Sequence, residues 1–142
     1  RMAESGRPIL IAPPTAPTRL GHNVVIAWNR STETARCVAL AMPLLYAAKK
    51  VTVLTVTGGM VPGPDGDEVA RYLERNGIAA DSITADPGNK NSGEVFLERA
   101  AELGCDLFIK GAYTQSRLRQ MIFGGATSHI LAKTTVPVFM AH

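Results

Sequence analysis

The sequence predicts a single α/β domain built on an open parallel β-sheet, and three observations lead to this prediction. Short apolar runs rich in β-branched residues alternate with segments whose apolar residues recur at helical spacing. Such β-α repetition favours parallel strands joined by right-handed crossovers. The length of 142 residues fits one domain with its own core. An apolar content of 46% with 19% charged residues excludes a disordered chain and a coiled coil.

The first strand of this domain is predicted at residues 24–28, where the run Val-Val-Ile-Ala-Trp lies between two asparagines. Ser31 is placed to cap the helix that follows. The apolar face of that helix consists of residues at helical spacing, namely Ala35, Val38, Ala39, Met42, Leu45 and Tyr46. Pro43 predicts a kink, because proline in a regular helix interior costs about 3 kcal/mol relative to alanine.

The middle of the chain continues the alternation. Residues 51–56 form the second predicted strand, and a loop rich in glycine and proline follows over residues 58–66. A helix is predicted over residues 67–76, with Gly77 as its C-terminal cap. A weaker strand is predicted at residues 81–85.

The turn Asp86-Pro87-Gly88-Asn89 leads into the next helix. Asn91, with Glu94 three residues later, has the pattern of a capping box and opens a helix that ends at Gly104. The fourth strand is predicted within residues 106–110.

The C-terminal part contains a long loop, one helix and one strand. The loop covers residues 111–125, the final helix residues 126–133, and the last strand residues 136–141. Pro137 lies within that strand and predicts an exposed edge or a bulge, because proline has no N–H to donate in a central strand.

The first twenty residues precede this domain and carry a pattern of their own. Residues 1–6 are typical of a helix end with a glycine cap, and residues 7–14 of a strand with proline at both ends. Residues 15–21 indicate a linker. A helix end, a strand and a linker ahead of a complete β/α unit suggest that residues 1–14 are the remnant of a preceding domain. The alternative is a chain that starts at Met2.

Charge is distributed unevenly along the chain. The net charge is +3, and after Asp106 there is no acidic residue but four fixed positive charges, at Lys110, Arg117, Arg119 and Lys133. This stretch is either a solvated basic face or a site for an anion such as phosphate. The few aromatic residues are not interleaved with the basic ones, which argues against nucleic acid as a partner.

The expected compartment is the cytoplasm, without a membrane partner. No apolar run approaches the roughly 20 residues of a membrane-spanning helix, and the chain does not start with a signal-peptide pattern. Cys37 and Cys105 cannot form a disulfide framework, and we expect them to be inert, partly buried thiols. The cysteines and the scattered histidines have no metal-ligand spacing, so no metal site is predicted.

The loop over residues 111–125 is the strongest candidate for chemistry. Its glycines allow close approach of a ligand, and the helix that follows presents free N–H groups and a positive dipole end. Together with Arg117 and Arg119 these groups could cradle a phosphate chain near Gly124 to Thr127. The alternative is that Gly111, Gly124 and Gly125 serve only turns and helix packing.

Several enzyme and signalling classes lack their defining residues here. There is no nucleophile–base pair, no Gly-x-Ser-x-Gly elbow and no P-loop with Gly-Lys-Ser/Thr. A phosphoacceptor receiver domain needs clustered acids at the end of the first strand, and this chain has only Asn29 there. No catalytic residue is therefore predicted.

Two motifs carry a resemblance to a known family. Gly111 and Gly124 match the first and third glycines of the pattern Gly, two residues, Gly, nine residues, Gly and Ser/Thr, with Thr114 at the second glycine and Gly125 at the Ser/Thr. Residues 27–31 resemble a first-strand end where Asp-Gly-Ser is common. Over residues 22–142 the chain thus resembles the universal stress protein family, particularly a bacterial branch with two domains in tandem.

The resemblance implies an adenine nucleotide alpha hydrolase-like fold, with strand order 3-2-1-4-5 and helices on both faces of the sheet. It also implies a nucleotide site. Near the base and ribose it places Ala27, Asn29 and Val56, and near the phosphates Gly111, Thr114, Gly124, Gly125 and Ala126. Thr127 lies one step past the motif, and its hydroxyl is a candidate substitute for the missing Ser/Thr.

Departures from the family pattern lower the expected affinity. Asn29 is neutral and accepts only through its amide oxygen, Thr114 adds a Cβ, and Gly125 removes a hydroxyl. The prediction is a non-enzymatic stress-response module that binds ATP or another adenine nucleotide weakly, with Mg²⁺ only alongside the nucleotide. The alternative is an ATP-hydrolysing or adenylyl-handling enzyme of the same architecture.

The resemblance also bears on the edge of the sheet. In this family the fifth strands of two domains pair antiparallel, either in a homodimer or between tandem halves. We predict that residues 8–12 pair antiparallel with residues 136–141 and complete a six-stranded mixed sheet, because that apolar edge would otherwise invite association. The same strand could instead be exchanged into a second chain.

Overall fold

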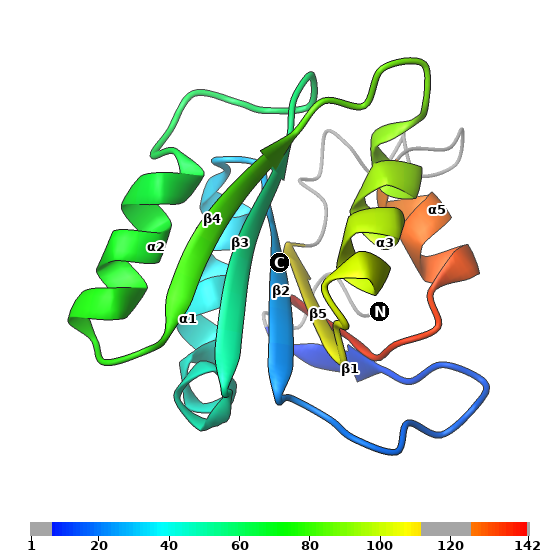
Figure 1. The fold of residues 1–142 in the computed structure, drawn as a ribbon, viewed down its shortest axis with the longest axis horizontal. Coiled ribbons are helices and arrows are strands. Elements are labelled where there is room, and N and C mark those ends of the chain that lie inside the picture. The colour runs from blue at the N-terminus through cyan, green and yellow to red at the C-terminus, as the bar shows by residue number, and fades with distance from the viewer. Residues whose placement is uncertain (1–6, 112–125, 142) are drawn as a thin grey trace.

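The computed structural model describes residues 7–111 and 126–141, and these contain one six-stranded sheet with helices on both of its faces (Figure 1). The strands are β1 (Ile9–Ile11), β2 (Asn23–Trp28), β3 (Lys50–Val56), β4 (Ala80–Ala85), β5 (Leu107–Gly111) and β6 (Val138–Ala141). The helices are α1 (Thr32–Ala47), α2 (Gly66–Arg75), α3 (Ser92–Glu102) and α5 (Ala126–Lys133). The predicted helix end at residues 1–6 and most of the predicted loop, residues 112–125, lie outside the described residues.

The strands lie in the order β1-β6-β5-β2-β3-β4. The five strands from β4 to β6 are parallel, which confirms the expected order 3-2-1-4-5. β1 pairs antiparallel with β6, with Ile9 opposite Met140 and Ile11 opposite Val138. The added edge strand is therefore confirmed, although it covers residues 9–11 rather than the whole of 8–12.

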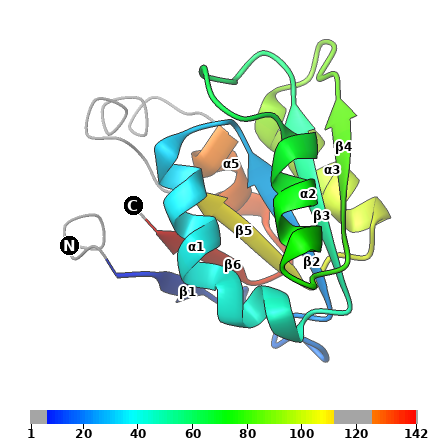
Figure 2. The same ribbon diagram turned by 90° about the vertical axis from the view of Figure 1, so that its left-hand side faces the viewer.

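The sheet separates two apolar cores, because successive side chains of a strand point to opposite faces. α1 and α2 cover one face, and α3 and α5 cover the other (Figures 1 and 2). Val24 and Ile26 of β2 pack on the α1/α2 side, whereas Val25 packs on the α3/α5 side. On that second side the Phe96 and Phe108 rings meet edge to face, with centroids 6.2 Å apart. None of the helices in the described ranges is long and apolar enough to cross a membrane.

Local capping follows the sequence closely. The Ser31 and Asn91 side chains accept hydrogen bonds from the Thr34 and Glu94 amides, at 3.2 and 3.1 Å, as the N-cap predictions require. The start of α2 differs slightly from the prediction, because Asp65 caps the helix by accepting from the Glu68 amide at 2.9 Å. An N-cap of this kind stabilises a helix by about 1 kcal/mol.

The buried side of α1 differs from the predicted apolar face. Ala35, Ala39 and Tyr46 are exposed, and the buried residues are Thr34, Cys37, Val38, Ala41 and Leu45. The cause is that small and polar side chains make specific contacts beneath the helix, such as the Cys37 thiol, which donates to the Lys110 carbonyl at 3.3 Å. The helix continues through Pro43 to Ala47, and a bend at the proline stays a prediction.

The expectation that Pro137 marks an exposed edge or a bulge is wrong. β6 lies between β5 and β1, and its pairing with β5 runs without interruption from Val138 to Ala141. Pro137 is buried immediately before the strand, and its carbonyl accepts a hydrogen bond from the Phe108 amide at 2.9 Å. Because the proline precedes the strand, its missing N–H removes no hydrogen bond within it.

Candidate functional site

The candidate residues gather where β2, β3 and β5 end. Ala27 lies opposite both Leu54 of β3 and Lys110 of β5, and Val56 and Gly111 are the last residues of those two strands. The chain order reverses between β2 and β5, because the strands after β2 extend in one direction and β5 and β6 lie in the other. Ligands of open parallel sheets bind outside the carboxyl ends of the strands at such a reversal.

Ala27 and Val56 project to the same face of the sheet. Both side chains are 3% exposed and belong to the apolar core under α3 and α5. Both are apolar and lie on neighbouring strands. These two predicted positions therefore lie together on the α3/α5 side.

Lys110 is a buried cation. From the sequence it was noted only as one of the four positive charges after Asp106, where no acidic residue occurs. It is 8% exposed and lies two residues after Phe108, so strand alternation directs its side chain to the α3/α5 side, beside Ala27. A single lysine in the apolar run Leu-Phe-Ile-Lys-Gly is the signal that could have identified it, because lysine is rarely buried.

Asn29 has a structural task in the turn between β2 and α1. Its amide oxygen accepts hydrogen bonds from the Ser31 amide at 3.1 Å and from the Thr34 hydroxyl at 2.8 Å. An amide oxygen has two lone pairs, so the acceptor that was expected to meet a ribose is already engaged by the protein. The next residue, Arg30, stands where the Asp-Gly-Ser segment of the resemblance has its glycine, and it adopts a left-handed backbone with φ of 68°.

Gly111 is required for packing against α1. A Cβ at this position would lie 2.7 Å from the Thr34 hydroxyl and 2.8 Å from the Thr34 backbone nitrogen. Of the two interpretations of this glycine, close helix packing is therefore the one that the described contacts support. Thr114, Gly124 and Gly125 lie outside the described residues, as do Arg117 and Arg119.

The first turn of α5 lies at the same edge of the sheet, because α5 connects the carboxyl end of β5 to the start of β6. Ala126 is its first residue, and Thr127 is buried at 6% exposure. A helix N-terminus presents unpaired N–H groups and favours negative charge.

The loop between β3 and α2 is fastened to the β2–α1 turn. The Val61 amide donates to the Asn29 carbonyl at 3.1 Å, and the Trp28 indole nitrogen donates to the Pro64 carbonyl at 2.9 Å. Gly63 lies so close to Arg30 that a Cβ there would collide with the Arg30 carbonyl oxygen. These contacts, which join residues far apart in sequence, brace the α1/α2 side of the site.

The two cysteines do not contribute reactive groups to this site. Cys37 and Cys105 are free thiols; Cys37 is fully buried and Cys105 is 9% exposed, so both are more buried than expected. Burial raises the pKa of each thiol to about 11, so both stay protonated near neutral pH. Within the two described ranges, no group of three or more His, Cys, Asp and Glu side chains could hold a metal ion.

The fold is shared with solved structures of one family, although no family model and no curated protein sequence matches the chain. A universal stress protein from Archaeoglobus fulgidus superposes with a TM-score of 0.74 at 17% identity, covering 97% of this chain and 50% of that protein. This chain thus spans about half the length of that relative.

Two further structures contain a nucleotide. A universal stress protein family protein from Arabidopsis thaliana with AMP bound has a TM-score of 0.62 at 13% identity, covering 84% of this chain and 90% of its own. A universal stress protein in complex with cAMP has a TM-score of 0.61 at 17% identity, covering 85% of this chain and 96% of its own. The chain therefore has the adenine nucleotide alpha hydrolase-like fold of the universal stress proteins.

Proposed function

We propose that this chain is a universal stress protein module that binds an adenine nucleotide weakly and does not turn it over. The observation that carries the proposal is the position of Ala27 and Val56, side by side in one core at the carboxyl ends of β2 and β3. Structures with the same fold contain AMP or cAMP, which supports this class of ligand.

In this proposal the base lies over Ala27 and Val56 on the α3/α5 side. The phosphates lie at the first turn of α5, near the Thr127 hydroxyl and the backbone of Ala126, with Thr114, Gly124 and Gly125 completing the phosphate loop. Mg²⁺ would enter only with the nucleotide phosphates, which bind this ion through their oxygens. Affinity is low because the Asn29 oxygen already accepts two hydrogen bonds within the protein.

Isothermal titration calorimetry tests this function with AMP, ATP and ATP with Mg²⁺, followed by a turnover assay on the same samples. We expect binding without release of phosphate or pyrophosphate. Turnover that is lost in a Gly124→Trp variant would instead favour the enzyme of the same architecture. Absence of heat for every nucleotide would contradict the proposal.

A matched pair of threonine variants locates the phosphates. Thr127→Val removes the hydroxyl at the α5 N-terminus and should weaken ATP binding by about fivefold, the loss expected for one hydrogen bond. Thr52→Val removes a buried hydroxyl from β3 that has no hydrogen-bond partner. The Thr52 variant should bind ATP like the parent protein, and equal affinity of both variants would place the phosphates elsewhere.

We further propose that residues 1–14 are the end of a preceding domain of the same kind, in a cytoplasmic protein. The antiparallel pairing of β1 with β6 supports this origin, as does the match to half of a longer universal stress protein. Deletion of residues 1–14 should uncover the edge of β6 and promote dimers or aggregates, which analytical ultracentrifugation would detect. A truncated protein that stays monomeric and equally stable would contradict this role of β1.

A further inference from the structure

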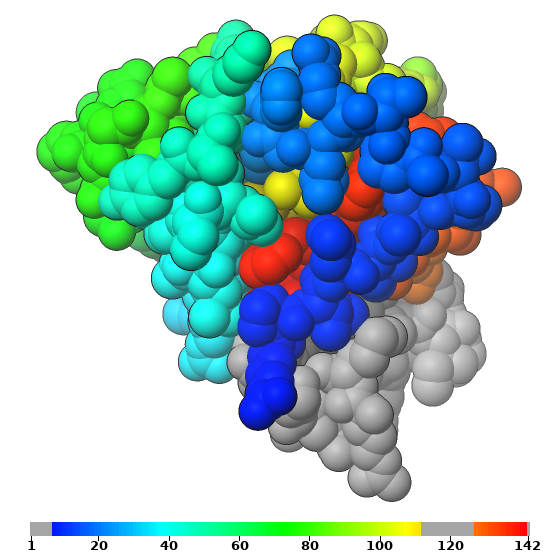
Figure 3. Space-filling model, turned by 90° about the horizontal axis from the view of Figure 1, so that it is seen from below, coloured from blue at the N-terminus to red at the C-terminus, as the bar shows by residue number. Residues whose placement is uncertain are grey.

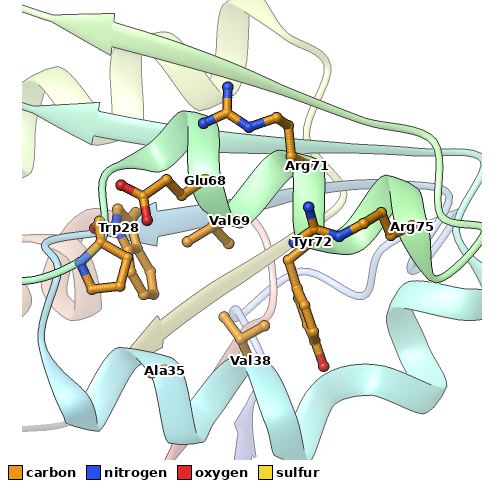
Figure 4. Close-up of a pocket in the computed structure, with 9 residues that line it drawn as sticks. Trp28, Ala35, Val38, Glu68, Val69, Arg71, Tyr72 and Arg75 are labelled. Atoms are coloured by element: carbon orange, nitrogen blue, oxygen red, sulfur yellow. Dashed lines mark hydrogen bonds between the residues drawn. The ribbon is translucent and has the colours of Figure 1, made fainter.

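A surface groove lies between α1 and α2, on the opposite side of the sheet from the proposed nucleotide site (Figure 4). Its volume is about 500 Å³, within the range of small-molecule sites, which is roughly 300–1,000 Å³. Its lining comes from the end of β2 and the loop before α2, through Trp28 and Pro64, and from the facing sides of α1 and α2, through Ala35, Val38, Val69 and Tyr72.

The floor of the groove is apolar and both of its ends are marked by larger side chains. Val38 of α1 and Val69 of α2 face each other across it (Figure 4). Trp28 and Pro64, joined by the indole hydrogen bond, lie at one end, and the Tyr72 ring extends from α2 toward α1 at the other. Both ends lie within the span of a ten-residue helix, about 15 Å, so a compact molecule fits better than a long helical peptide.

The two ends of the groove carry opposite charges. Glu68 lies near the Trp28 end, whereas the Arg75 side chain runs back along α2 toward Tyr72 (Figure 4). Among the described residues no ion pair engages Arg71 or Arg75. Figure 4 shows the Arg71 side chain extending away from α1, so Arg75 is the guanidinium placed to meet an occupant.

We propose that this groove binds an amphipathic monocarboxylate, a small molecule with an aliphatic or aromatic body and one acid group. The apolar body lies on Val38 and Val69. Its uncharged end points toward Trp28, because the Glu68 carboxylate at that end of the groove would repel the acid group of the ligand. The acid group pairs with Arg75 beside Tyr72, since a guanidinium matches a carboxylate with two parallel hydrogen bonds. The site is independent of the proposed nucleotide site, which lies on the other face of the sheet.

The intrinsic fluorescence of Trp28 provides a direct test, because the chain has one tryptophan and it lines the groove. Decanoate is the probe, with 1-decanol as its uncharged counterpart. We expect saturable change of Trp28 emission with decanoate and markedly weaker binding of decanol. No saturable change below the micelle-forming concentration of decanoate, or equal binding of decanol, overturns the proposal.

Three variants distinguish the groove from a general apolar surface. Ala35→Phe fills the groove from an exposed position of α1 and should abolish decanoate binding. Arg75→Gln should weaken it about fivefold, as expected for an exposed ion pair, while Arg71→Gln on the same helix serves as the matched control. Equal effects of the two arginine variants overturn the assignment of the carboxylate.

Two further measurements distinguish this groove from the nucleotide site and from a contact between copies of the chain. AMP should leave the decanoate titration unchanged, and the Ala35→Phe variant should bind AMP like the parent protein. If AMP does not bind, the decanoate titration still tests the groove. If decanoate does not bind, the AMP titration still tests the nucleotide site. If Ala35→Phe alters the sedimentation of the protein, the groove is a contact between copies of the chain and the small-molecule proposal is wrong.

Discussion

The two sides of the sheet use the carboxyl ends of the same strands in different ways. On the α1/α2 side, Asn29 bonds within the β2–α1 turn, and Gly111 admits the first turn of α1. On the α3/α5 side, the same strand ends present the small side chains of Ala27 and Val56 together with buried Lys110. Motif positions of one predicted site are thus divided between the two faces of the sheet, and the proposed base contact lies on the α3/α5 side.

This difference teaches that a residue type alone does not identify a ligand contact. Gly111 and Asn29 occur where the family pattern implies nucleotide contacts, yet their observed partners are in α1 and its N-cap. Lys110 was not among the predicted site residues, yet it is buried beside Ala27, on the side where the base is proposed to bind. The following variants test this division, from the largest expected effect to the smallest.

Gly111→Ala tests packing on the α1 side most strongly. Its Cβ would come within 3 Å of three atoms of Thr34, two of them backbone atoms, so α1 or β5 must shift. We expect a loss of about 3 kcal/mol in the free energy of unfolding, measured by urea denaturation. Gly59→Ala is the control, because a Cβ there meets nothing within 4 Å, and its stability should change little. Equal stability of the two variants would show that Gly111 is not a packing residue.

The pH dependence of stability tests burial on both sides of the sheet, because Cys37 lies in the α1/α2 core and Cys105 in the α3/α5 core. Burial raises both folded-state pKa values from 9.0 to about 11. The folded state then holds protons that the unfolded state releases, so each thiol's stabilising contribution is complete below pH 9 and lost between pH 9 and 11. About 2 kcal/mol should be lost per thiol.

Chemical denaturation across this pH range measures that loss. Cys37→Ala and Cys105→Ala should each have a shallower decline of stability with pH than the parent protein. The comparison of slopes removes the titration of lysines and tyrosines, which all three proteins share. A decline that is unchanged in the Cys37 variant would mean that this thiol ionises in the folded protein as it does in the unfolded chain.

Asn29→Asp tests whether residue 29 can keep its hydrogen bonds within the β2–α1 turn and also accept one from a ribose hydroxyl. One carboxylate oxygen can keep the hydrogen bonds to Ser31 and Thr34, and the second oxygen becomes available to a ribose hydroxyl. We expect AMP affinity to rise about fivefold by calorimetry, with little change in unfolding free energy. Asp67→Asn on exposed α2 removes one negative charge and should leave AMP affinity unchanged. Unchanged affinity in Asn29→Asp would place the ribose away from this turn.

Arg30→Gly tests backbone strain where the β2–α1 turn meets the loop between β3 and α2. A left-handed conformation with φ of 68° is costly for arginine and accessible to glycine, whose greater freedom in the unfolded chain offsets part of the gain. We expect thermal denaturation to show a gain of about 0.5 kcal/mol. Arg71→Gly, within exposed α2, should instead lose about 1 kcal/mol. Destabilisation by both glycines would indicate that the Arg30 side chain contributes more than its backbone costs.

Much of the fold was predictable because its signals are local or periodic. The apolar runs of β2 and β3 are buried on both faces, so their positions follow from hydrophobic pattern alone. The buried side of α1 was not predictable in this way, because Thr34 packs against Gly111 and the Cys37 thiol donates to the Lys110 carbonyl, both distant in sequence. Of the predicted site residues, Ala27 and Val56 lie at the ends of neighbouring strands. Their contacts with a ligand stay predictions, as do those of Thr114, Gly124 and Gly125.

By itself the sequence determined the order of strands and helices and the caps at Ser31 and Asn91, because a cap satisfies backbone groups within one turn of the chain. Only the tertiary structure decided what Gly111 touches, where Lys110 is buried and how Trp28 holds the Pro64 loop. These contacts join segments that are distant in sequence. Their partners are set by the packing of strands and helices, which no local pattern of residues encodes. The pairing of β1 with β6 is another contact between segments distant in sequence. In Figure 3 the N-terminal segment (dark blue) lies beside the C-terminal strand (red) at this edge of the sheet.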